Sequence, residues 1–111
     1  MSHKAYKVIE NAKLDLMAWA KERQIPTHRI EYVAAFEDWN DHLSVWIFFD
    51  TNSDRDKCVE NGVVNEIKNT YLEILRKYEY PFDEFPKIDF EFDSHENVVK
   101  NFRGNYFYRL R

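Results

Sequence analysis

The chain has 111 residues, of which 44% are hydrophobic and 32% are charged. This length suits one ordinary domain, and the composition excludes the disordered class of proteins. The single cysteine, Cys58, excludes an internal disulfide, and the longest apolar run, residues 45–49, is too short to cross a bilayer. The N-terminus leads directly into an amphipathic pattern with no secretory signal, so we expect a cytoplasmic protein that does not bind a membrane.

A first helix is expected over residues 3–23. Its apolar residues recur every three or four positions, and the approach to Pro26 ends it. From His28 the apolar period changes to two and continues to Glu37, which is typical of a half-buried strand. After the polar stretch 38–42, residues 43–49 form a second strand with bulky residues on both faces. Because the connection is so short, we expect the two strands to pair as an antiparallel hairpin.

The second half of the chain contains two further helices and two further strands. Ser53 and Asp56 have the spacing of a capping box, and the long helix that follows extends to about Tyr78, with a break at Gly62. Alternating apolar residues predict a third strand over 88–93. Asp93 with Glu96 then starts a short helix to about residue 101, and residues 106–110 are expected to form a fourth strand.

These elements predict an α+β fold in one domain, residues 1–111. Two main helices pack on one face of a mostly antiparallel four-stranded sheet, and a short helix precedes the last strand. Strand alternation assigns eight apolar residues and Phe36 to the face that the helices cover. The eight residues are Ile30, Tyr32, Val45, Ile47, Phe49, Ile88, Phe90 and Phe92.

The opposite face of the sheet is the candidate interface. Aromatic residues make up 17% of the chain, more than one modest core needs, so some are expected on a surface. Large rings surrounded by charged groups are typical of a recognition surface. The predicted contact residues are Trp46, Phe48, Asp89, Glu91, Phe107 and Arg109. Two alternatives stay open: a solvated face with cross-strand ion pairs, or a face on which the C-terminal segment or a second copy covers Trp46 and Phe48.

No pattern in the chain supports catalysis or a cofactor. Residues 50–56 place oxygen side chains as a calcium-binding EF-hand loop does, but Arg55 stands where that loop needs Gly and Asn61 where it needs Glu. The four histidines have no metal-ligand spacing, and two glycines provide no phosphate-binding loop. We therefore expect no metal and no cofactor, and we favour a non-catalytic protein over a small enzyme.

A protein partner, or a second copy of the chain, is favoured over nucleic acid. The net charge of −4 disfavours attraction to phosphate and suits a basic partner. Residues 103–108 resemble the aromatic strand of RRM domains, which makes an RNA-binding accessory domain the second hypothesis. In size, acidity and aromatic content the chain is similar to bacterial immunity proteins, which neutralise toxins by covering them. This likeness is one of composition, and no residue role is transferred from it.

Overall fold

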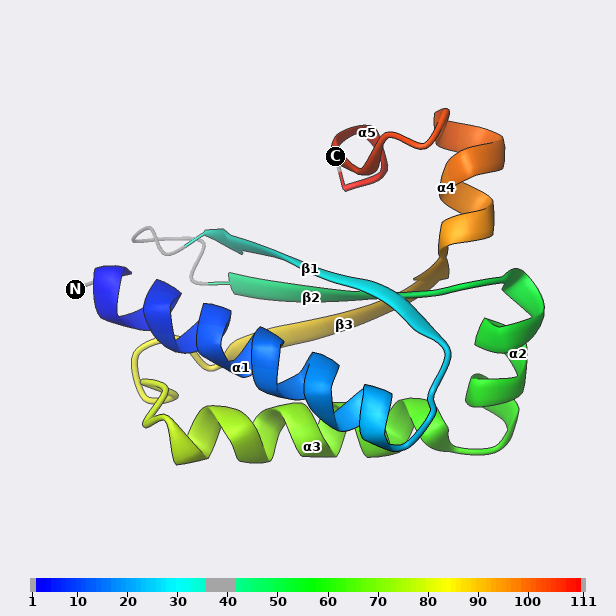
Figure 1. Ribbon diagram of the computed structural model, residues 1–111. Coiled ribbons are helices and arrows are strands. Elements are labelled where there is room, and N and C mark those ends of the chain that lie inside the picture. Colours follow the sequence, from blue (N-terminus) through cyan, green and yellow to red (C-terminus); the bar gives the residue numbers. More distant parts are fainter. Residues whose placement is uncertain (1, 36–41, 111) are drawn as a thin grey trace.

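The computed structural model describes residues 2–35 and 42–110 (Figure 1). Phe36, which was predicted to face the helices, lies outside these ranges. The fold belongs to the α+β class, as predicted. In chain order the elements are α1 (Ser2–Glu22), β1 (Thr27–Ala35), β2 (His42–Phe49), α2 (Asn52–Glu60), α3 (Val63–Lys77), β3 (Lys87–Ser94), α4 (His95–Phe102) and α5 (Tyr106–Arg109).

In the described part of the chain the sheet has three strands, in the order β1-β2-β3. The prediction of an antiparallel hairpin is confirmed for β1 and β2. β3, however, runs parallel to β2, with Leu43 opposite Ile88 and Phe49 opposite Ser94. The two helices between these strands return the chain to the end of the sheet where β2 begins, which is the usual way to join parallel neighbours. The predicted four-stranded, mostly antiparallel sheet is therefore wrong.

The predicted fourth strand is also wrong, because residues 106–109 form the short helix α5. Asn105 precedes this helix, and its side chain accepts a hydrogen bond from the backbone N–H of Tyr108. Gly104, with a φ of +74°, ends α4 in the left-handed region that glycine tolerates. The chain thus turns back over the sheet instead of extending along it (Figure 1).

The helix limits follow local signals. The break at Gly62 is confirmed: its φ of 83° separates α2 from α3. The predicted caps are shifted by one or two residues. The side chain of Thr51, not Ser53, caps α2, and Ser94, not Asp93, caps α4. In both cases a hydroxyl oxygen accepts the hydrogen bond of an otherwise unpaired N–H in the first turn.

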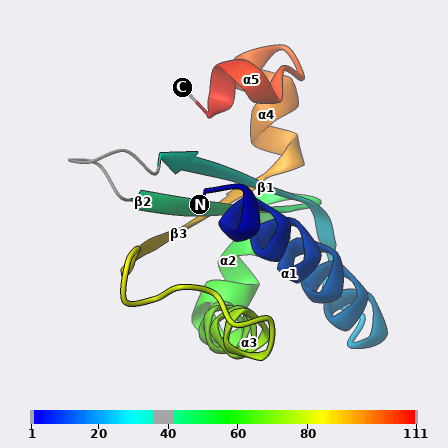
Figure 2. The same cartoon turned by 90° about the vertical axis from the view of Figure 1, so that its left-hand side faces the viewer.

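The main core lies between the sheet and the layer formed by α1 and α3, while α4 and α5 lie on the other side of the sheet (Figure 2). The eight described residues predicted to face the helices all pack in this core or against it, so the assignment of the two sheet faces is confirmed for them. The alternation of each strand then fixes which side chains point to the opposite face, which we call the outer face.

Candidate functional site

The outer face is organised in rows of side chains that cross the three strands. The strand register places Arg29, Phe48 and Asp93 in one row. The next row contains Glu31, Trp46 and Glu91, and the third contains Val33, Ser44 and Asp89. Of the residues in these rows, Trp46, Phe48, Asp89 and Glu91 were predicted from sequence to lie on this face.

The C-terminal cap, which we define as α4 and α5, covers Phe48 and Asp93 of the first row, whereas Arg29 stays exposed. Phe48 is fully buried and forms a small core with Val98 and Tyr106. The rings of Phe48 and Tyr106 meet edge to face, with their centroids 4.7 Å apart. The prediction that Phe48 is an exposed anchor is therefore wrong, and the alternative in which the C-terminal segment covers it is confirmed. Removing the apolar surface of Phe48 from water is favourable, so the cap packs on this ring and does not leave it exposed for a partner.

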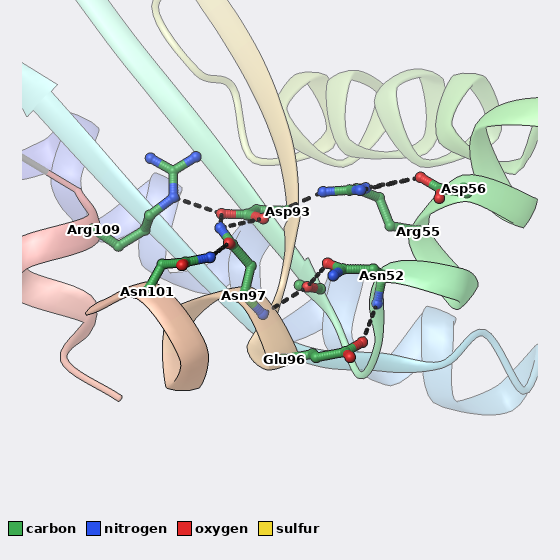
Figure 3. A network of polar contacts seen from close by, with 9 residues as sticks. Asn52, Arg55, Asp56, Asp93, Glu96, Asn97, Asn101 and Arg109 are labelled. Carbon is green, nitrogen blue, oxygen red and sulfur yellow. Dashed lines mark hydrogen bonds and ion pairs between the residues drawn. The ribbon is translucent and has the colours of Figure 1, made fainter. Parts of the chain in front are cut away.

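Asp93 is the polar centre beneath the cap, and only 3% of its surface is exposed (Figure 3). The Arg109 Nε donates to its Oδ2 over 2.5 Å, and Arg55 lies 3.5 Å from its Oδ1. The Asn97 amide donates to both carboxylate oxygens, at 3.0 and 2.9 Å. A buried carboxylate is costly unless it is paired and hydrogen-bonded, and here both oxygens are satisfied.

Two further predicted contact residues belong to this internal arrangement. The guanidinium carbon of Arg109 lies 4.7 Å from the centroid of the Trp46 ring and 5.3 Å from that of Phe102. Trp46 is only partly exposed and packs against the small core under the cap. Arg109 therefore holds α5 on the sheet through its ion pair and cation–π contacts, rather than projecting towards a partner.

A cluster of rings joins the start of β1 to the cap. His28 and His95 stack with their centroids 3.8 Å apart, and His28 lies 3.5 Å from Asp50. The His95 Nδ1 is 2.7 Å from the Tyr106 hydroxyl. Burial is the largest cause that raises the Tyr106 pKa, although the Arg29 guanidinium above its ring lowers it. The protonated phenol therefore remains a hydrogen-bonding group at neutral pH.

The rest of the outer face is uncovered by the cap, and we call it the open half: Glu31, Val33, Ser44, Asp89 and Glu91. Val33 is 43% exposed, and both Asp89 and Glu91 are exposed. Glu31 is paired with Lys13 and Arg29, and Asp89 with His42. On α5, Phe107 is 70% exposed. Asp89, Glu91 and Phe107 are thus the predicted contact residues that the fold leaves accessible.

The calcium-loop lookalike and Cys58 take part in local structure in the described residues. Within 2–35 and 42–110 no group of three or more His, Cys, Asp or Glu side chains is placed to hold a metal ion. Thr51 and Asn52 of the calcium-loop lookalike serve the start of α2, where Asn52 accepts a bond from Ser94 and its N–H donates to Glu96. Cys58 is buried, and burial, with a smaller effect of Asp54, raises its pKa, which disfavours the nucleophilic thiolate.

The Asp93 network was missed at the sequence level. Its partners come from α2, α4 and α5, so only folding brings them together. One local signal was available. Asp93 and Asn97 are four residues apart, a spacing that brings two side chains together at the start of a helix. Sequence alone gives no means of pairing Arg55 or Arg109 with that carboxylate.

Comparison with protein-family models, with curated proteins and with solved structures gives no match for this chain. Of the described helices, none is both long enough and apolar enough to cross a bilayer. The fold and the site thus define an α+β domain with a mixed three-stranded sheet, one face of which is half covered by the C-terminal cap.

Proposed function

We propose that this chain is a non-catalytic protein-interaction domain that binds a protein partner through the open half of the outer face. The observation that carries the proposal is the incomplete cover of that face. The cap covers Phe48 and Asp93 and leaves Val33, Asp89 and Glu91 accessible, and Phe107 on the cap is itself exposed. Apolar groups within a charged rim are typical of surfaces that bind proteins.

The charge of this surface favours a basic partner. Glu31, Asp89 and Glu91 supply the acids of the open half, and the Arg109 charge is directed inward to Asp93. Complementary charges speed association and exclude wrong partners, and they make binding sensitive to salt. An immunity-type inhibitor that covers a basic toxin in the cytoplasm is the most concrete form of the proposal.

The competing functions lose the features that suggested them. The RRM-like hypothesis needed an aromatic strand at residues 103–108, but α5 is helical and its Tyr106 ring is buried. An enzyme would need a hollow that brings histidine and acid together. An open hollow lies at the end of α1, but its lining contains neither a histidine nor an acid. The lining residues are Met17, Ala18, Ala20, Lys21, Gln24, Ile25 and Thr27. We therefore retain protein binding.

Quantitative capture from the source cells tests the proposal. The bait variant Val33→Asp with Glu91→Arg changes the open half, and Val59→Asp with Glu73→Arg makes the same changes on α2 and α3, where Val59 is 53% exposed and Glu73 is also exposed. We expect at least one protein that the wild type and the α2/α3 variant capture and the open-half variant loses. Capture that both variants retain, or both lose, would contradict the assignment of the surface.

Self-association is examined with the same variants by light scattering. The wild type is expected to be a monomer, because two copies would bring the acids of the open half together. A dimer that the open-half variant alone converts to a folded monomer would replace the separate partner with a second copy of the chain. Circular dichroism checks that each variant is folded.

A further inference from the structure

The free edge of β3 is the strongest unused feature of the sheet. β3 pairs with β2 along residues 87–94, and no other strand of residues 2–35 and 42–110 pairs with it. Within the described ranges, no backbone hydrogen bond joins residues 87–92 to any segment other than β2. Such an edge presents unpaired N–H and C=O groups, on which an additional strand can form.

The opposite edge of the sheet differs. β1 has a register irregularity between Thr27 and Arg29, which disrupts regular pairing near its start. Towards its other end, the Tyr6 hydroxyl donates to the Ala34 carbonyl over 3.2 Å. Irregularities and side-chain contacts of this kind protect an edge from further strands. Of the two edges, β3 is therefore the better template.

The exposure of the core-facing side chains of β3 indicates that its edge lacks a neighbouring strand. Leu43, Val45 and Ile47 on β2 are at most 1% exposed. Their partners on β3 are Ile88, Phe90 and Phe92, and all three are only half buried although they pack against the same core. Apolar side chains of a fourth strand would remove the remaining area of these residues from water, which is favourable.

The charges around this edge select the occupant. Residues 79–93 contain six acids and one basic residue, Lys87; the acids are Glu79, Asp83, Glu84, Asp89, Glu91 and Asp93. All are exposed except Asp93, which Arg55 and Arg109 neutralise. Pairing with the β3 edge of a second copy would place Asp89 and Glu91 near like charges, which destabilises cross-strand pairs. Lys or Arg side chains in those positions would be attracted.

We propose that β3 binds an extended segment of a protein partner as a fourth strand, in which Lys or Arg alternates with apolar residues. The basic side chains lie beside Asp89 and Glu91, and the apolar ones beside Ile88, Phe90 and Phe92. This inference rests on the proposed function and specifies its partner. The edge of β3 supplies main-chain hydrogen bonds, and the acidic and apolar side chains on the two sides of β3 supply the sequence preference.

The test uses synthetic peptides of about eight residues, the length of an ordinary strand, with Lys or Arg alternating with Val or Ile. A control peptide has the same composition with its apolar residues grouped together. Two further peptides carry N-methyl groups on one or the other set of alternate residues. We expect the alternating peptide to bind and to slow amide exchange in residues 88–92. One N-methylated peptide should lose binding and the other keep it, because only one edge of the added strand faces β3.

Charge variants locate the contact. Asp89→Lys with Glu91→Lys is expected to weaken binding of the alternating peptide by about tenfold, the effect of two reversed cross-strand contacts. Because Asp89 also pairs with His42, Glu91→Lys alone provides a second variant that leaves this ion pair intact, with a smaller loss. Glu60→Lys with Glu73→Lys, both exposed on α2 and α3, changes the net charge equally and should bind as the wild type does.

Several results would overturn the inference. Equal binding of the grouped peptide would indicate charge attraction without a strand, as would equal binding of both N-methylated peptides. Protection of residues 31–33 on β1 in place of residues 88–92 on β3 would move the contact to the face. If capture depends on the open half while no peptide binds β3, the edge proposal fails and the proposed function stands. If the peptide binds β3 but the open-half variant captures the same proteins as the wild type, the proposed function fails and the edge proposal stands.

Discussion

Asp93 shows how one residue connects the sheet to the cap. It lies one residue before the end of β3, on the outer face, where an unpaired carboxylate would be unfavourable under α4 and α5. Arg55 and Arg109 approach it from elements on either side, and Asn97 approaches from the first turn of α4. The same carboxylate therefore compensates Arg109, which would otherwise add a positive charge to the acidic surface proposed for partner binding.

Replacing Asp93 with Asn should destabilise the protein strongly. The change leaves two arginines without their shared acceptor, and we expect a loss of about 2–3 kcal/mol in the free energy of unfolding, below the full cost of a buried charge because both arginines reach solvent. Urea unfolding measures it. Asp56→Asn removes an exposed partner of Arg55 and should cost less than about 0.5 kcal/mol. Equal losses in the two variants would contradict the role of Asp93.

The C-terminal cap consists of the two short helices α4 and α5, which follow β3. Ser94 begins it: its hydroxyl accepts from the Asn97 N–H over 3.0 Å and donates to Asn52 on α2. The buried rings of Phe48 and Tyr106 supply its apolar contact. Because the cap defines the limit of the open half, its stability determines how much of the outer face is accessible.

Ser94→Ala is expected to loosen the cap more than the rest of the fold. The variant loses both hydrogen bonds of the hydroxyl, and we expect a cost of about 1–2 kcal/mol. Hydrogen exchange should become faster in α4 and remain nearly unchanged in α1 and α3. Thr51→Ala provides the matched control, because it removes the equivalent cap of α2. Uniform acceleration in every helix of the Ser94 variant would show that the cap does not open separately.

Local sequence patterns predicted those elements that are determined by residues close together in the sequence. The apolar spacing of α1, the hairpin of β1 and β2 and the break at Gly62 were all visible in the sequence. The direction of β3 was not, because its alternation of apolar and acidic residues reads the same in parallel and antiparallel pairing. Residues 106–110 were too short and too aromatic to distinguish a strand from one helical turn, and the capping role of Asn105 was the missed signal.

The sequence predicted which side chains lie on the outer side of the sheet, but not which of them are exposed. Strand alternation placed Trp46, Phe48, Asp89 and Glu91 correctly on the outer side of the sheet. Which of them stays exposed depends on the cap, whose contacts span about half the chain. Long-range contacts of this kind have no local sequence signature, and so the burial of Phe48 and the inward direction of Arg109 emerged only from the structure.

At the scale of the whole molecule, buried tyrosines link the fold to alkaline pH. Burial raises the pKa of Tyr80 to about 12, and its hydroxyl donates to the Phe85 carbonyl over 3.1 Å. Burial also raises the pKa of Tyr71, whose hydroxyl is buried without a hydrogen-bond partner. Because the ordinary value is 10.0, the unfolded chain loses these protons first as the pH rises. The stabilisation that the protonated phenols of Tyr71 and Tyr80 contribute is therefore complete below pH 10 and is lost progressively above it.

Above pH 10 the free energy of unfolding should thus decrease by up to about 1.4 kcal/mol per pH unit for each of these tyrosines. Tyr71→Phe should reduce this slope by the share of one group. At pH 7 the same change should leave stability equal or increase it by about 1 kcal/mol, since it removes an unpaired buried hydroxyl while keeping the ring. Urea unfolding of both proteins at pH 7 and at several values above 10 separates packing from ionisation. Parallel pH profiles for the two proteins would mean that the Tyr71 phenol ionises as readily in the folded chain as in the unfolded one, which its complete burial opposes.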